Sequence, residues 1–498
     1  MLESILKDTG KDALRYIPAR VVPAMVNFIG LLVFTHIFSA EDYGNYFIIL
    51  ATISVMSIIG SSWVTNSVIR FYPEFKLKHD LDRFFTNIIF AFIICNSVIL
   101  PLYVFGFFLF KTQISQTLIP FFRLSIFAYL SSAMYLVFLH FLRASLQSIA
   151  FSTYEILSSV GKFVVALGLV FFFKMGAISL LWGVLLMSII LSVLISKKFS
   201  LTKRLKTELF SKEICKKFWR YGFPLAFSSL SAWVLVLSDR YILQYFRAAK
   251  EVGIYSVSFS AVDRSIGMLY AVLMLAAFPI IISTWEEKGK EITQQLIKEL
   301  SRYFFILCIP VFVGLSILSK DIFILFMGEN FVESFRLVPL FAFCSLIMGL
   351  FQYVGKGFDI YKKTLLLALI FLISGLINVG LNILFIPVYG YMGAGIAKTI
   401  SYIVLLVLCV KIVYRIMAWR APLISLSRIV FSAALMGVFL ILVKKFLSAS
   451  LMNLIVLIAG GTCVYFILLF LFHEIKKSEI DFVKSYYNKL VKAKSIKK

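Results

Sequence analysis

The chain has 498 residues, of which 61% are hydrophobic and only 15% are charged. This composition excludes an ordinary soluble domain, because one globular core could not hide so many apolar side chains from water. The formal net charge of +25 is spread over many short polar breaks, so no compact basic domain for nucleic acid is predicted. Attraction to an anionic cytoplasmic leaflet explains this charge more simply.

Long apolar runs alternate with the polar breaks, and most runs reach the roughly 20 residues that a membrane-spanning helix needs. The runs are continuous and lack the period-two alternation of a β-barrel, so we predict an all-α polytopic membrane protein. About 14 transmembrane helices are expected, with cores near 17–38, 44–69, 84–110, 118–142, 150–173, 176–196, 218–245, 252–284, 302–319, 335–355, 364–386, 391–413, 424–443 and 451–472.

The distribution of positive charge predicts the orientation. Lys and Arg are about four times as frequent in every second break as in the others, and cytoplasmic loops carry such an excess. Both termini are therefore predicted to be cytoplasmic. Residues 1–16 are mixed and amphipathic, and Arg20 interrupts the apolar run that follows, so no cleavable signal peptide is expected.

The sequence also repeats itself. LRYIP around Arg15 returns as WRYGFP around Arg220, FSAEDYGNY returns as FRAAKEVGIY, and KMGAISLLWG returns as YMGAGIAKTIS. Each repeat holds six spans, which predicts two parallel six-helix lobes related by an axis along the membrane normal. The expected domains are an N-terminal lobe (1–196), a basic cytoplasmic linker (197–217), a C-terminal lobe (218–415), two additional helices (416–473) and a basic cytoplasmic tail (474–498).

Motifs for catalysis or for metal binding are missing from the sequence. None of the six cysteines forms a CxxC pair, and the four histidines are scattered near span ends, so we predict no disulfide framework and no metal site. GxxxxGK[ST], HExxH and GxSxG do not occur. We therefore predict a protein that is not an enzyme and that carries no cofactor.

Three segments resemble a known family. FTHIFSAEDYGNYF, LSDRYILQYFRAAKEVGIYSVSFSA and NVGLNILFIPVYGYMGAGIAKTIS are similar to the polysaccharide transporter family, the Wzx-type oligosaccharide flippases. That family belongs to the multidrug/oligosaccharidyl-lipid/polysaccharide superfamily, with lipid II flippases and multidrug extruders. The resemblance implies a two-lobed, V-shaped transporter in the cell inner (cytoplasmic) membrane. It would flip undecaprenyl-diphosphate-linked oligosaccharides by alternating access, with a central cationic cavity for the diphosphate and the sugars.

The resemblance also sets the expected partners. They are a lipid-linked oligosaccharide, membrane lipids, a proton or sodium ion as the coupling ion, and other polysaccharide assembly proteins. A lipid II flippase or a multidrug exporter of the same superfamily is an alternative. A membrane polysaccharide polymerase or glycosyltransferase is an alternative of another class, but the breaks on the outer side are too short for a catalytic loop.

Charges inside the apolar runs are the candidate site residues. Lys162 lies close to mid-bilayer, where a lone ammonium group costs at least roughly 2.5–3.5 kcal/mol. It is expected to line a wet cavity and attract a diphosphate or an acidic sugar, or else to pair with Glu155 two helical turns earlier.

Two Asp-Arg pairs lie on consecutive spans. Asp239 and Arg240 could neutralise the other pair and fix helix packing, or they could contact substrate. Asp263 and Arg264 lie deeper, and ligand contact and ion coupling are both open for them. Either carboxylate could carry a coupling proton, because desolvation favours its neutral form.

Three further arginines and one lysine complete the predicted substrate-binding residues. Lys398 follows Gly393-Ala394-Gly395 and could either face a cavity or snorkel outward. Arg15, Arg20 and Arg70 lie near cytoplasmic span ends. They could form a diphosphate entry site through bidentate contacts, or they could simply anchor the chain by the positive-inside rule.

Overall fold

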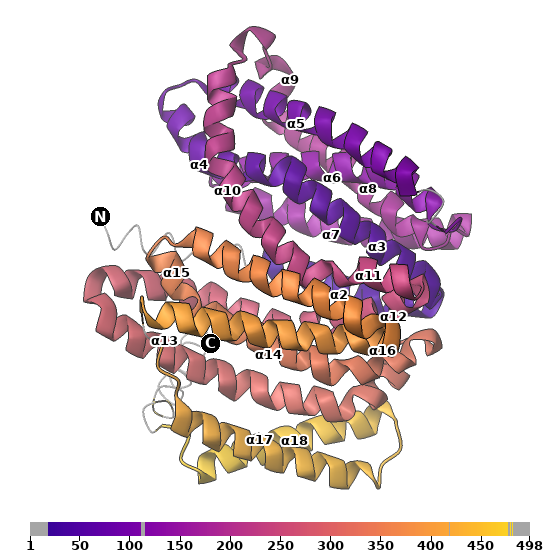
Figure 1. The fold of residues 1–498 in the computed structure, drawn as a ribbon, viewed down its shortest axis with the longest axis vertical. Coiled ribbons are helices and arrows are strands. Elements are labelled where there is room, and N and C mark those ends of the chain that lie inside the picture. Colours follow the sequence, from indigo (N-terminus) through magenta and orange to yellow (C-terminus); the bar gives the residue numbers. More distant parts are fainter. Residues whose placement is uncertain (1–17, 111–114, 418, 477–478, 480, 482–498) are drawn as a thin grey trace, which may run out of the picture. The chain divides into compact units, whose positions relative to one another are not determined.

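The computed structural model describes residues 18–110, 115–417, 419–476, 479 and 481. Every regular element in these residues is a helix (Figure 1). The elements in the first half of the chain are α2 (Pro18–Ile37), α3 (Ala40–Ser57), η1 (Ile58–Ser62), α4 (Trp63–Leu77), α5 (Leu81–Phe110), α6 (Ile119–Ala144), α7 (Ser148–Phe173), α8 (Ile178–Lys198), α9 (Leu201–Arg204), η2 (Thr207–Leu209), α10 (Lys212–Leu237) and α11 (Asp239–Phe246). Those in the second half are α12 (Ala249–Val262), η3 (Asp263–Gly267), α13 (Met268–Phe326), η4 (Glu329–Leu337), α14 (Val338–Val354), α15 (Lys356–Ile360), α16 (Thr364–Tyr414), α17 (Leu423–Lys444) and α18 (Leu451–Leu471).

Twelve helical runs among the described residues are long and apolar enough to cross a membrane. Two of them are too long for a single crossing. The run Ala249–Phe326 has 78 residues and Thr364–Tyr414 has 51, which at 1.5 Å per residue is about 117 Å and about 76 Å against a hydrocarbon core of about 30 Å.

Glycine divides each of these two runs into two spans. Gly289 has φ 74° and Gly390 has φ 56°, both outside helical geometry. An L-residue with a side chain rarely adopts positive φ, so glycine is the residue suited to these breaks. Counting both sides of each break gives the 14 spans that hydropathy predicts, and the all-α fold class is confirmed.

The break between α7 and α8 also lies where the sequence places it. Lys174 caps α7 with a left-handed backbone (φ 52°), and α8 begins four residues later at Ile178. The basic linker that follows is held against α5. The Asn87 amide donates to the Leu209 carbonyl (2.9 Å), and the Ser211 backbone N–H donates to Asn87 Oδ1 (2.7 Å).

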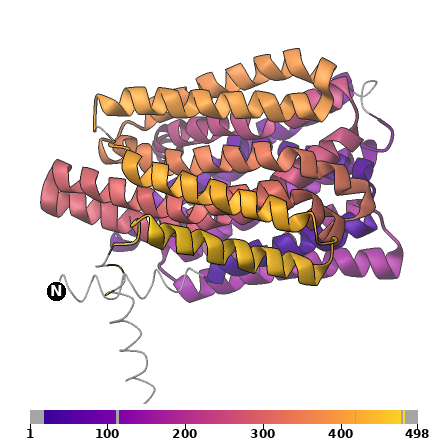
Figure 2. The ribbon, with the colours of Figure 1, turned by 90° about the horizontal axis from the view of Figure 1, so that it is seen from below.

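The described residues form two compact units. Unit 1 comprises the described parts of Met1–Arg264 with Met327–Leu337 and Lys362–Leu408. Unit 2 comprises Ser265–Phe326, Val338–Tyr361 and the described parts of Cys409–Lys498, and within it α17 and α18 lie side by side (Figure 2). These units divide the chain by compactness. The lobes 1–196 and 218–415 divide it by internal repeat, and those boundaries remain a prediction.

The matching segments of the two repeats pack against each other inside unit 1. Helix α3 begins with the first copy of the repeated motif and α12 begins with the second, and the two helices cross at Gly44 and Gly253. A Cβ atom on Gly44 would lie 1.8 Å from the Ala249 carbonyl oxygen, and one on Gly253 would lie 2.0 Å from that of Ala40. The contact therefore requires glycine on both helices.

Candidate substrate-binding site

A cavity of about 240 Å³ lies within unit 1, and we call it the charged cavity. Helices α2, α3, α7 and α8 form its wall together with Arg264 of η3. One acidic and two basic side chains line it, namely Glu155, Lys162 and Arg264. When all three are ionised, the wall carries one positive charge in excess, which suits an anionic guest.

Lys162 lies near the middle of α7, about 21 Å along a helix about 39 Å long. Its Nζ atom is 5.7 Å from the centroid of the Tyr135 ring, a cation–π distance. The Tyr135 hydroxyl donates to the Tyr154 carbonyl oxygen (3.0 Å), which fixes that ring. Within the described part of the chain Lys162 forms no ion pair, so its charge can act on a molecule in the cavity.

Glu155, the predicted pairing partner of Lys162, lines the same cavity. The two side chains interact electrostatically without forming an ion pair, and the charge of Arg20 also acts on Glu155. A carboxylate at this place makes the wall mixed rather than purely cationic. The structure thus brings Lys162 and Glu155 into one wall without joining them in an ion pair.

Arg264 reaches the charged cavity from a π-helical turn, a local distortion that is frequent at functional sites. One of its guanidinium nitrogens donates to the backbone oxygen of Asn27 on α2. Asp263 precedes it by one residue and is exposed. Asp263 does not line this cavity.

Two tyrosines complete the polar lining, and the sequence reasoning missed them. Tyr43 and Tyr46 stack with their ring centroids 5.9 Å apart, and Tyr43 also meets Phe331 edge-on at 5.8 Å. Both belong to the repeated Tyr-Gly-Asn-Tyr motif on α3. The motif was therefore the available signal, but it indicated a repeat rather than a site.

A second charged cluster in unit 1 is sealed, and we call it the buried triad: Asp239, Arg240 and Lys398. Asp239 and Lys398 are 0% exposed and Arg240 is 3% exposed. Lys398 Nζ lies 2.5 Å from Asp239 Oδ2, and Arg240 lies 3.2 Å from Asp239 Oδ1. The Tyr255 hydroxyl donates to the same carboxylate, and Lys398 Nζ also lies 4.6 Å from the Phe259 ring centroid. One carboxylate and two aromatic rings thus compensate two buried cations.

Equivalent helices of the two repeats form different charged sites. The charged cavity lies among the first, second, fifth and sixth spans of the first repeat. The buried triad lies on the first and sixth spans of the second repeat, and Tyr255 on the second span, the repeat counterpart of Tyr46, contacts it. The first repeat therefore has a cavity where the second has an internal salt bridge.

The predicted entry arginines do not reach the charged cavity. Arg20 is exposed near the start of α2, and Arg70 is exposed on α4 with its guanidinium 5.6 Å from the Phe71 ring centroid. Arg15 lies outside the described residues. The structure therefore brings Lys162 and Arg264 together, groups Asp239, Arg240 and Lys398 elsewhere, and leaves Arg20, Arg70 and Asp263 outside both sets.

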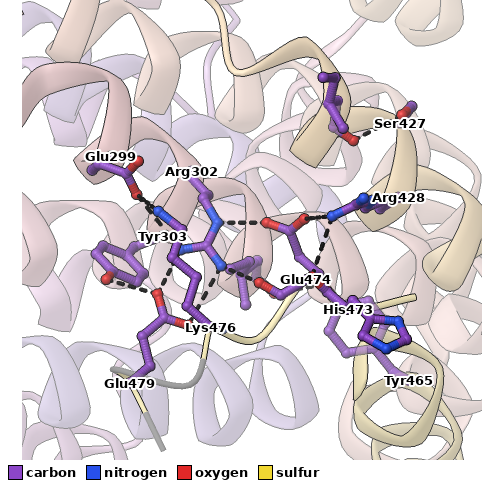
Figure 3. Close-up of polar contacts among 12 residues, drawn as sticks. Glu299, Arg302, Tyr303, Ser427, Arg428, Tyr465, His473, Glu474, Lys476 and Glu479 are labelled. Atoms are coloured by element: carbon purple, nitrogen blue, oxygen red, sulfur yellow. Dashed lines mark hydrogen bonds and ion pairs between the residues drawn. The ribbon is translucent and has the colours of Figure 1, made fainter. Parts of the chain in front are cut away.

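Unit 2 holds a polar cluster that hydropathy did not single out. Figure 3 shows the Arg302 guanidinium of α13 between Glu474 and Glu479, which follow α18. Arg302 lies 2.5 Å from each carboxylate, and both Arg302 and Glu474 are 2% exposed. Lys476 pairs with Glu299 at 2.8 Å. These contacts attach the segment after α18 to α13. Among the described residues no group of His, Cys, Asp and Glu is arranged to hold a metal ion.

Comparisons with known proteins agree with this architecture. Residues 9–285 match the family described as polysaccharide biosynthesis protein. A Haloferax volcanii protein, "Probable low-salt glycan biosynthesis flippase Agl15", is 23% identical over 180 residues, and the match covers 36% of this chain and 37% of the relative. The uncharacterized membrane protein MJ1068 of Methanocaldococcus jannaschii is 20% identical over 388 residues, 73% of this chain and 76% of the relative.

Solved structures match the fold over most of the chain. The lipid II flippase MurJ in an inward closed conformation has a TM-score of 0.74 at 16% identity, covering 93% of this chain and 98% of that one. An inward-facing multidrug resistance MATE family transporter of the MOP superfamily has a TM-score of 0.59 at 16% identity, covering 79% of this chain and 95% of that one. At these identities the likeness is one of fold.

Proposed function

Because the chain belongs to the polysaccharide biosynthesis protein family and has the fold of MOP-superfamily transporters, we propose that it is a flippase for lipid-linked oligosaccharides. The family predicted from the sequence is confirmed, and the fold agrees with the predicted superfamily. The substrate in this proposal is an undecaprenyl-diphosphate-linked repeat unit. The proposed location is the cytoplasmic membrane, with both termini on the cytoplasmic side.

The observation that supports this proposal is the position of Lys162. An ammonium group without an ion-pair partner among the described residues, at the middle of a membrane-length helix, is expensive unless a wet cavity or a ligand compensates it. Arg264 from another helix faces the same cavity. A diphosphate offers several anionic oxygens and could contact both cations together, while Glu155, which lies on the predicted cytoplasmic side of Lys162, would repel an anion that stops short of the two cations.

The size of the charged cavity favours one charged group as its guest. Ligand pockets usually measure about 300–1,000 Å³, and this cavity of about 240 Å³ is smaller. The proposed mechanism is alternating access, in which the crossing of Gly44 and Gly253 closes the outer end while substrate enters from the inner side. Separation of α3 and α12 would then open the cavity outward.

The remaining predicted residues take supporting roles in the proposal. Arg15, Arg20 and Arg70 would attract the diphosphate to the inner entrance. Coupling to a proton or sodium ion is assigned to Asp239 and Asp263. Protonation of Asp239 would weaken its pairs with Arg240 and Lys398, and both cations could then turn toward substrate. Other polysaccharide assembly proteins would deliver and consume the glycan.

The test is transport in liposomes. Purified protein is reconstituted with fluorescent undecaprenyl-diphosphate carrying an oligosaccharide, and the share of label reached by a membrane-impermeant reagent is followed over time. Wild-type protein should move the lipid between leaflets, and Lys162→Ala should abolish movement. Lys250→Ala is the matched control, because Lys250 is an exposed lysine at the start of α12. Lipid II and a small organic cation in parallel assays separate this function from those of the two solved relatives.

A further inference from the structure

A second cavity of about 770 Å³ lies within unit 1, and we call it the aromatic cavity. Its wall includes Tyr103 and Phe107 of α5, Phe122 of α6, and Tyr241, Gln244 and Tyr245 of α11. Among the described residues, none of the side chains that line it is charged. It therefore differs from the charged cavity both in size and in chemistry, and the mechanism proposed above does not use it.

The aromatic cavity is placed at the membrane boundary opposite the basic linker. The linker is bound at Asn87 near the start of α5, and Tyr103 lies sixteen residues further along the same helix, about 24 Å away. The residues of the cavity lie within about two turns of the far ends of α5 and α11. If the linker is cytoplasmic, as the charge bias predicts, this cavity faces the outer side.

The cavity also lies between the two sequence repeats. Helices α5 and α6 belong to the first repeat, whereas α11 belongs to the second. Ile48 of α3 lines the aromatic cavity and its neighbour Phe47 lines the charged cavity, so the two cavities lie on opposite sides of α3. A movement of α3 against the second repeat would change the shape of both.

Three polar atoms that line the aromatic cavity are available as hydrogen-bond acceptors. The Thr52 hydroxyl donates its only hydrogen to the Ile48 carbonyl oxygen (2.9 Å). In the 2.7 Å hydrogen bond between Thr52 and Tyr241, the Tyr241 hydroxyl is therefore the donor. The Tyr241 oxygen then has no hydrogen left for a ligand, only lone pairs.

The hydroxyl hydrogen of Tyr103 is also already used in a hydrogen bond. Ser125 donates to the Phe122 carbonyl (2.7 Å), so Tyr103 donates to Ser125 across 2.6 Å and also keeps only lone pairs. Gln244 adds a third acceptor. Its Oε1 atom is buried and has no hydrogen-bond partner among the described residues. Leaving such an atom unpaired costs free energy, which a ligand with a donor would recover.

We propose that the aromatic cavity binds the uncharged sugar rings of the transported glycan. Acceptor atoms without charge favour hydroxyl donors and disfavour phosphate or carboxylate groups. Aromatic faces suit the apolar C–H faces of sugar rings, and the volume falls in the range of ligand pockets. An organic cation would also suit aromatic rings, and the test below therefore includes one as a competing probe. This inference rests on the proposed flippase function and assigns its glycan a separate site.

The test measures binding rather than transport. Full-length protein in nanodiscs is titrated with lipid-free oligosaccharides released by mild acid from the lipid-linked glycans of the producing cells. Hydrogen–deuterium exchange is followed over residues 102–107 and 241–246, with inorganic pyrophosphate and tetraphenylphosphonium as separate probes. The oligosaccharides should protect both segments, and the other two probes should not.

Two sets of variants, one at Gln244 and one at Tyr245, make the test specific. Gln244→Ala should weaken oligosaccharide affinity about tenfold, while Gln295→Ala, at an exposed glutamine of α13, should not change it. Tyr245 is 75% exposed, so Tyr245→Leu should fold normally and weaken binding, and Tyr245→Phe should retain it. Tyr414→Leu, at another exposed tyrosine, is the control.

Three results would overturn the inference. They are unprotected segments at saturating oligosaccharide, protection by tetraphenylphosphonium instead, and unchanged affinity in both Gln244→Ala and Tyr245→Leu. The liposome assay separates this outcome from failure of the proposed function. Oligosaccharide binding without lipid movement would refute the flippase, whereas lipid movement with wild-type rates in both variants and no binding would refute only the glycan site.

Discussion

Gly44 of α3 and Gly253 of α12 occupy equivalent places in the two sequence repeats, and they pack against each other. Each lacks a side chain where the other helix passes, and a Cβ atom on Gly44 would lie only 1.8 Å from the Ala249 carbonyl oxygen. Small residues allow helices in membranes to approach this closely. The two copies of the repeated motif are therefore in contact at the helix crossing that is proposed to close the outer end of the transporter, and we call this crossing the outer gate.

A side chain at this crossing should keep the gate from closing. Gly44→Leu is expected to force α3 and α12 apart and to reduce transport at least tenfold, because the inward-facing state can no longer form. The measurement is lipid movement in liposomes, with thermal unfolding as the check on folding. Gly380→Leu is the matched control, since nothing lies within 4 Å of a Cβ atom there. Wild-type transport by folded Gly44→Leu would contradict the gate.

Lys162 and Lys398, the two lysines within predicted spans of unit 1, should respond oppositely to the same substitution. Lys398→Met removes the ammonium group from Asp239 Oδ2 while Arg240 stays paired with this carboxylate, which should cost about 1–3 kcal/mol of stability. Lys162→Met removes a cation without an ion-pair partner among the described residues and should leave stability unchanged or raised. Thermal unfolding in nanodiscs compares the two variants directly. Equal destabilisation by both would show that Lys162 is a structural residue.

Arg302 should hold the segment after α18 against α13. Arg302→Met leaves the buried Glu474 carboxylate without its main partner, so this segment should detach and become sensitive to protease. Cleavage after residue 471, followed by mass spectrometry, measures the detachment. Lys476→Met removes only a pair with the exposed Glu299 and should have little effect. Equal cleavage of wild type and Arg302→Met would contradict this attachment.

The same attachment should depend on pH in a defined direction. Burial raises the pKa of the Glu479 carboxyl, but hydrogen bonds from Arg302, the Lys476 backbone N–H and Tyr303 lower it more, so the pKa lies below its usual 4.5. A carboxyl with a lowered folded pKa stabilises the folded form above the unfolded pKa and loses that contribution as pH falls through the folded value. Protease sensitivity of the segment should therefore rise below about pH 4.5. Glu479→Gln should flatten this dependence, and an unchanged slope would argue against Glu479 as its source.

The sequence was most informative about the features that the thickness and low polarity of the bilayer determine. Span length, the positive-inside bias and the expense of a mid-membrane cation give the helix count and draw attention to Lys162. The same reasoning could not separate Lys162 from Lys398, because both are isolated cations in apolar runs. Lys398 meets Asp239 across 159 residues of chain, and only the packed fold places those two side chains together.

Hydropathy could not have identified other features of the sites. Tyr43 and Tyr46 are ordinary apolar-run residues until α3 turns them toward Arg264 in the charged cavity. Arg302 lies in a polar break by composition, yet it is buried because Glu474, 172 residues later, folds back onto it. The acceptor character of the aromatic cavity depends on which hydroxyl hydrogens are already used in hydrogen bonds within the protein. Those hydrogen bonds could not be predicted from the sequence.

Movement of a lipid-linked oligosaccharide across a sealed liposome is the most direct measurement of the central claim. With fluorescent undecaprenyl-diphosphate oligosaccharide, wild-type protein should carry the label between leaflets, and Lys162→Met should reduce the rate at least tenfold while the melting temperature holds or rises. A Lys162→Met protein that moves this lipid at the wild-type rate would contradict the account, because the diphosphate would then not depend on the cation in the charged cavity.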